Sequence, residues 1–103
     1  MDLQGKFATI FTMDEVKRVR IVGDRDGISK LIIDVHGLSC REAKHFINNI
    51  INVSGIKCRV TIIHGYNHGS AIKTMINNQF ENQHVYQKEM DLKNLGITHL
   101  YIA

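Results

Sequence analysis

The chain contains 103 residues, of which 44% are hydrophobic and 22% are charged, and its formal net charge is +3. This length fits one domain with a moderate core, and the composition is too apolar for a disordered chain. The sequence has no proline and no apolar run near the roughly 18 residues of a membrane helix, which argues against a proline-rich linker or a membrane span. The first residues lack the basic and apolar regions of a signal peptide, so we expect a cytoplasmic location.

Residues 1–28 are expected to form an extension that packs on the domain. Thr12 and Glu15 have the spacing of a capping box, which predicts a short helix. The residues after it alternate between apolar and basic side chains, as in a strand, and the sequence GDRDG at 23–27 predicts a turn. The domain itself is expected over residues 29–103.

The domain is predicted to begin with a strand–helix–strand unit. The sequence KLIIDV at 30–35 is short and rich in β-branched residues, which indicates a strand. Ser39 and Glu42 form a capping box, so a helix should start near Cys40, and the alternating segment 57–63 should form the next strand. Because such a crossover is right-handed, the two strands should be parallel.

The remaining residues predict a second helix and two further strands. The helix is expected from about Ser70 to Phe80, and the strands at 84–88 and 98–102. The predicted fold is therefore an α/β, two-layer βαβαββ sandwich with a mixed four-stranded sheet.

The positive charge is concentrated in the middle of the chain. Residues 31–80 contain five basic and two acidic side chains, a net charge of +3, whereas residues 1–30 carry +1 and residues 81–103 carry −1. A locally positive face attracts polyanions such as nucleic acid. On charge alone, a solvated surface without a partner explains the distribution equally well.

A histidine lies directly after each of the first two strands of the predicted sheet. His36 follows the first strand and His64 follows the second. Ligands of open α/β sheets bind outside the carboxyl ends of parallel strands, so both imidazoles should emerge at one edge and, if the strands are neighbours, share a crevice. Asp34 points to the same face as His36, where its carboxylate can orient the imidazole and stabilise the protonated form.

An oriented histidine suits phosphodiester cleavage because it accepts and donates protons near neutral pH. The candidate catalytic residues are therefore Asp34, His36 and His64. In the alternative interpretation, Asp34 caps a loop or pairs with a lysine, and His36 only ends a strand. These side chains and His68 could instead bind a metal, although no HxH or HxxxH pair is present in a predicted helix or strand and structural zinc usually recruits thiolates.

The loop after the second strand leads directly into the second helix and contains two glycines. Glycine allows a positive φ and close approach of a ligand, and the free amides at a helix start attract anions. An aromatic side chain in the loop could stack on a base. Tight turns need glycine in any case, so the loop alone is a weak indication. The residues expected to contact nucleic acid or phosphate are Gly65, Tyr66, Asn67, His68, Gly69, Ser70, Lys73 and Arg41.

Two motifs resemble those of the Smr domain family, which is named for small MutS-related proteins. The family's L-D-x-H motif falls on residues 33–36 (IDVH), and its H-G-x-G-x-G motif falls on residues 64–69 (HGYNHG), with Asn67 in place of the middle glycine. The closing segment 96–102 (GITHLYI) also resembles the last strand of that family, and the resemblance covers about residues 29–103. It implies a fold similar to the C-terminal domain of translation initiation factor three.

The resemblance also implies a nuclease that nicks DNA or cleaves RNA, or a module that binds nucleic acid. We expect an endonuclease in which His36, oriented by Asp34, acts as general base or acid, and His64 assists or binds phosphate. The amides of Gly65 and Gly69 would hold the phosphate. The alternatives are a non-catalytic module that binds nucleic acid or the ribosome, and a protein-interaction domain. The sequence leaves open whether cleavage requires Mg²⁺ or Mn²⁺.

Overall fold

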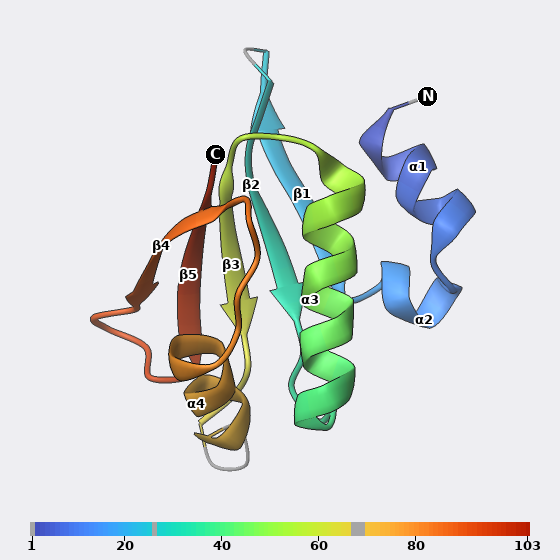
Figure 1. The fold of residues 1–103 in the computed structure, drawn as a ribbon. Coiled ribbons are helices and arrows are strands. Elements are labelled where there is room, and N and C mark those ends of the chain that lie inside the picture. The colour runs from blue at the N-terminus through green and yellow to red at the C-terminus, as the bar shows by residue number, and fades with distance from the viewer. Residues whose placement is uncertain (1, 26, 67–69) are drawn as a thin grey trace.

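The computed structural model describes residues 2–25, 27–66 and 70–103. Figure 1 shows a mixed α/β arrangement in which long strands lie behind the helices. In chain order, the described elements are α1 (Leu3–Ile10), α2 (Met13–Val16), β1 (Val19–Asp24), β2 (Gly27–Asp34), α3 (Cys40–Ser54), β3 (Arg59–Ile63), α4 (Ser70–Asn78), β4 (Val85–Met90) and β5 (Ile97–Ile102).

The strands form one five-stranded sheet in the order β1-β2-β3-β5-β4. The pair β2 and β3 is parallel, as predicted, and the other pairs are antiparallel. The predicted number of four strands is wrong because β1, part of the expected extension, pairs with β2 from Val19 opposite Ile33 onwards. This pairing supplies backbone partners to the edge of β2, which the shorter sheet would leave without a neighbouring strand.

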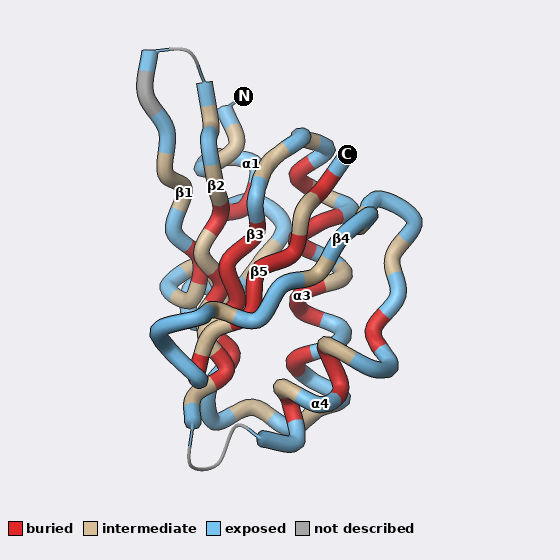
Figure 2. The backbone as a smooth tube through the Cα atoms, turned by 90° about the vertical axis from the view of Figure 1, so that its left-hand side faces the viewer, coloured by how far each residue is buried: buried red, intermediate tan, exposed pale blue. Residues whose placement is uncertain are grey.

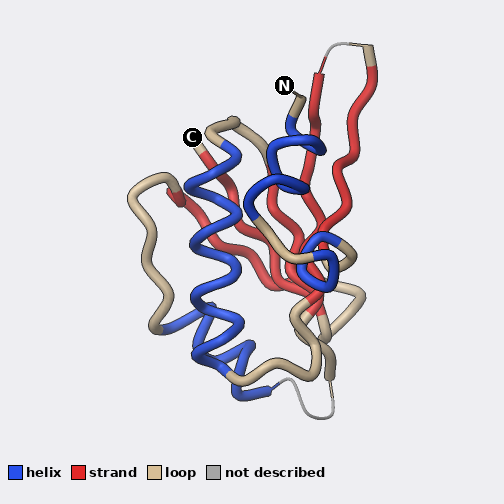
Figure 3. Tube along the Cα trace, turned by 90° about the vertical axis from the view of Figure 1, so that its right-hand side faces the viewer, coloured by secondary structure: helices blue, strands red, loops and turns tan. Residues whose placement is uncertain are grey.

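Both long helices of the domain lie on one side of the sheet, as Figures 1 and 3 show for α3 and α4. The strand residues that face these helices are fully buried, among them Leu31, Ile62 and Leu100. In Figure 2 the buried segments gather in the central strands and at intervals along the helices. The core therefore lies between the sheet and the helices, and no helix in the described ranges covers the opposite face of the sheet.

Local sequence signals explain where α3 begins and ends. The Ser39 hydroxyl accepts the backbone N–H of Glu42, and the Glu42 carboxylate accepts the backbone N–H of Ser39, so the predicted capping box is present. These bonds lower the pKa of the Glu42 carboxyl group. The helix ends at Ser54 and is capped by Gly55, whose φ of 61° is left-handed and suits glycine.

The predicted second helix begins at Ser70, as expected, but ends at Asn78 rather than near Phe80. The backbone N–H of Phe80 still donates to Met75, which closes the last turn, and the Phe80 ring is fully buried. Side-chain burial therefore continues past the helix end, which is why the apolar pattern overestimates its length.

The amino-terminal segment packs on the domain through helices as well as through β1. Thr12 caps α2 with the predicted reciprocal bonds to Glu15. Phe7 of α1 is buried, and the ring of Phe11 makes edge-to-face contacts with both Phe7 and Phe46 of α3. None of the helices in the described ranges has the length and apolar character that a membrane crossing requires.

Candidate functional site

The carboxyl end of β2 carries an oriented histidine–aspartate pair. Nδ1 of His36 donates a hydrogen bond to Oδ1 of Asp34, and the His36 backbone N–H donates to the same oxygen at 3.1 Å. The His36 side chain is 66% exposed and the Asp34 side chain 35% exposed. Since Asp34 engages Nδ1, and no described residue bonds Nε2, the second ring nitrogen of His36 is the one available to a substrate.

Arg18 holds the turn that presents this pair. Its Nη1 donates to the backbone carbonyls of Asp34 and His36, each at 3.1 Å. The Asp34 backbone N–H in turn donates to the Arg18 carbonyl at 2.7 Å. Sequence reasoning missed Arg18 because it lies in the extension, and its only signal was its place within a basic stretch.

Gly65 approaches the pair from the end of β3. A Cβ atom added to Gly65 would lie 3.6 Å from Cβ of His36, so the neighbouring strand ends meet as predicted. Its φ of 86° is in the left-handed region, which a side chain would strain. The backbone N–H groups of His64 and Gly65 both donate to the Gly96 carbonyl, at 2.9 and 3.1 Å. The expectation that the Gly65 amide holds phosphate therefore fails, because that donor already has an internal partner.

His64 does not share a crevice with His36. The His64 side chain points into the interior and is only 1% exposed, although the expected catalytic role requires contact with solvent or substrate. Nδ1 lies 2.9 Å from the Gly65 carbonyl and Nε2 lies 3.0 Å from the Thr98 hydroxyl. Because a carbonyl only accepts, Nδ1 carries the proton and Nε2 accepts from Thr98.

The surroundings of His64 favour its neutral form. Burial lowers the pKa of the imidazole, the bond to the Gly65 carbonyl opposes that shift, and the charge of Lys73 lowers the pKa further. The Thr98 hydroxyl also lies 3.4 Å from Nδ2 of Asn77, which can donate to it. Hydrogen bonds thus connect Asn77 of α4, Thr98 of β5, His64 and the Gly65 carbonyl. Through them His64 positions the turn beside His36.

The other residues predicted to bind nucleic acid lie around this edge or outside the described ranges. Tyr66 is 64% exposed directly after Gly65, and Ser70 is exposed at the start of α4. Lys73 lies in the first turn of α4 and is half-buried. The predictions for Asn67, His68 and Gly69 fall on residues that the structure does not describe.

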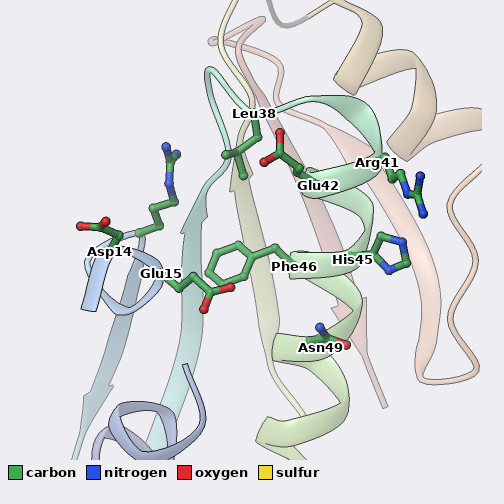
Figure 4. Close-up of a pocket in the computed structure, with 9 residues that line it drawn as sticks. Asp14, Glu15, Leu38, Arg41, Glu42, His45, Phe46 and Asn49 are labelled. Carbon is green, nitrogen blue, oxygen red and sulfur yellow. The ribbon is translucent and has the colours of Figure 1, made fainter. Parts of the chain in front are cut away.

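Arg41 lines a separate hollow of about 480 Å³ between α2 and α3. Figure 4 shows Phe46 projecting into it from α3, with Glu15 on the facing α2 side. Arg18 lines the same hollow and bonds the His36 carbonyl, so the hollow adjoins the candidate site through that one side chain. Acidic and basic side chains both line the hollow, so its charge does not favour an anionic ligand.

No group of three or more His, Cys, Asp or Glu side chains in the described ranges is placed to hold a metal ion. Asp34 and His36 by themselves offer only two ligands, and their mutual bond uses one atom of each. The chemistry that the pair can perform with its own atoms is proton transfer: Nε2 of His36 takes up or releases a proton while the Asp34 carboxylate stabilises the imidazolium ion. Comparisons with protein families, curated proteins and solved structures find no match to this chain.

Proposed function

We propose that this protein is a nucleic-acid endonuclease of the Smr type that uses His36 for acid–base chemistry on phosphodiesters. The observation that carries the proposal is the exposed Asp34–His36 pair at the carboxyl end of a parallel strand, next to the left-handed Gly65. The resemblance of residues 33–36 and 64–69 to the two family motifs supports it. The order of elements from β2 to β5 also supports a fold like the C-terminal domain of translation initiation factor three, and the proposal includes a cytoplasmic location.

In the proposed reaction, Nε2 of His36 removes the proton from the attacking oxygen. In RNA this oxygen is the 2′-hydroxyl, which bonds to the adjacent phosphorus while the bond to the 5′-oxygen breaks; in DNA it is a water molecule. The Asp34 carboxylate stabilises the imidazolium ion, which can return the proton to the departing oxygen. Lys73 and Ser70 lie where the start of α4 could meet the phosphate, and His64 keeps the turn in place from beneath.

A non-catalytic module that binds nucleic acid or the ribosome is the second candidate. Two observations favour it: His64 is buried, and the Gly65 amide already has an internal acceptor. Only one exposed imidazole then remains among the described residues of the two motifs. Salt-sensitive binding with no cleavage under any metal condition would support this candidate.

The deciding experiment is a cleavage assay on labelled RNA, single-stranded DNA and duplex DNA, without metal and with Mg²⁺ or Mn²⁺. We expect His36→Ala to slow cleavage by about a hundredfold or more, the usual contribution of a general acid or base. His84→Ala serves as a matched control, since His84 is an exposed histidine at the far end of the sheet. Equal rates for wild type and His36→Ala would reject the role of His36, and absence of cleavage in every condition would reject the endonuclease.

A further inference from the structure

The sheet face opposite α3 and α4 presents a row of basic and aromatic side chains. In β3, Arg59 and Thr61 alternate with residues that point into the core; Arg59 is exposed, whereas Thr61 is only 6% exposed and shares a hydrogen bond with His99. The strand register places Lys30 of β2 on one side of Arg59 and Tyr101 of β5 on the other. Arg20 of β1 lies on the same face in the next row. Three cations from three adjacent strands therefore share a surface that no described helix covers.

The positive charge of this open face is not neutralised within the described ranges. Arg20, Arg59 and the neighbouring Lys57 are exposed, and none of them forms an ion pair with a described carboxylate. Two carboxylates bond other donors of this face: Glu89 accepts from the Tyr101 hydroxyl at 3.3 Å, and Asp91 accepts from Nε2 of His99 at 2.8 Å. An anionic partner would thus meet cations on this face that are not paired with a described carboxylate.

Two tyrosines lie beside these cations. The rings of Tyr86 and Tyr101 are 6.3 Å apart between centroids, at 48° to one another, and Tyr86 is 66% exposed. Together with Lys57 and Arg59 they line a shallow hollow of about 570 Å³. Such a combination suits a nucleobase that stacks on an aromatic ring while its phosphate contacts a cation.

The open face leads from this hollow to the Asp34–His36 pair. Arg59 and Ile63 are the two ends of β3, and Asp34 lies beside Ile63 in the parallel register. The four residue steps between them span about 13 Å along the strand. A strand of nucleic acid that lies along β3 would therefore reach from the tyrosines to the candidate catalytic edge.

We infer that the open face binds single-stranded nucleic acid, with a base against Tyr86 and Tyr101 and phosphates against Lys30, Lys57 and Arg59. A single strand fits better than a duplex because only unstacked bases can lie on an aromatic side chain. The inference deepens the proposed function and rests on it for the course of the strand towards the catalytic edge, whereas binding itself does not require cleavage.

The test measures the affinity of the full chain for labelled oligouridine, oligothymidine and a duplex of equal length by fluorescence anisotropy. The protein carries His36→Ala, and a gel run in parallel records any cleavage. Tyr86→Ala and Arg59→Gln should each weaken single-strand binding about tenfold, and Arg59→Gln should reduce the salt dependence by about one phosphate contact. Tyr86→Phe should retain binding, and Lys44→Gln, an exposed cation on α3, should change affinity less than about twofold.

The inference is overturned if the Tyr86 and Arg59 variants bind like their parent, or if the duplex binds as tightly as the single strands. It is also overturned if no oligonucleotide binds; a dimer in sedimentation that Tyr86→Ala dissociates would then show that a second copy covers the face. Unchanged binding in the Tyr86 variant, combined with cleavage that depends on His36, would remove this inference alone. Weakened binding in that variant, combined with cleavage that persists in His36→Ala, would remove only the proposed role of His36.

Discussion

His36 and His64 follow neighbouring strands, and their surroundings give the two rings different roles. The His36 ring lies in solvent beside one carboxylate, whereas the His64 ring is buried with a hydrogen-bond partner at each nitrogen. We expect His64→Ala to lower the free energy of unfolding by about 2–4 kcal/mol, because the change leaves a void and unpaired polar groups.

The same substitution at His36 should change the free energy of unfolding by no more than about 0.5 kcal/mol, as is usual for an exposed side chain. Urea unfolding monitored by circular dichroism measures both variants under one condition. Similar losses for the two variants, or a larger loss for His36→Ala, would contradict the assignment of a positioning role to His64.

The buried imidazole of His64 should also make stability depend on pH. Its pKa in the folded chain is lower than its ordinary value of 6.5, so the unfolded chain binds the proton more readily. This contribution to stability is complete above pH 6.5 and is lost as the pH falls through 6.5 towards the folded pKa. The Asp91 carboxyl, whose pKa is lowered mainly by its bond to His99, acts only below its own ordinary value of 3.8.

Unfolding in urea at a series of pH values between 7.5 and 5 measures the effect of His64. The wild type should lose stability towards pH 5, and His64→Gln should lose less because its side chain does not titrate. An equal slope in the two proteins would show that another group causes the pH dependence.

At the scale of elements, the turn after β2 depends on the extension. Arg18→Ala removes two hydrogen bonds to the carbonyls of Asp34 and His36 and should cost about 1–2 kcal/mol of stability. Hydrogen exchange at the His36 amide should accelerate, since that N–H bonds a carboxylate within the same turn. Arg20→Ala, two residues further along the chain, is the control. Exchange at His36 that is the same in wild type and both variants would contradict the role given to Arg18.

The elements that could be predicted from the sequence are those that local signals define. The capping box at Ser39 and Glu42 and the apolar stripe that follows it are short-range features, so the start of α3 is confirmed at Cys40. The burial of His64 depends on Thr98, which lies 34 residues further along the chain. No local pattern reports such a contact, and the strand-end position alone could not distinguish a buried ring from an exposed one.

At the scale of the whole molecule, the sheet accounts for both the candidate site and the open face. Parallel pairing of β2 with β3 could be predicted, and it brings Gly65 to His36. The pairing of β1 with β2 could not be predicted, because the alternation of apolar and basic residues in β1 fits an independent hairpin as well as a fifth strand. The described helices all lie away from one face of the sheet, so the basic and aromatic side chains of that face are left uncovered by helices. Their common surface could not be predicted, because it depends on how all the strands and helices assemble.

Chemical rescue shows whether the imidazole of His36 transfers the proton during phosphodiester cleavage. Because the His36 side chain is 66% exposed, free imidazole can enter the space left in His36→Ala. We expect cleavage by the variant to be slow and to rise in proportion to added imidazole, while wild type and His84→Ala do not respond. A His36→Ala variant that cleaves as fast as wild type, or that stays folded and slow at every imidazole concentration, would contradict this role of His36.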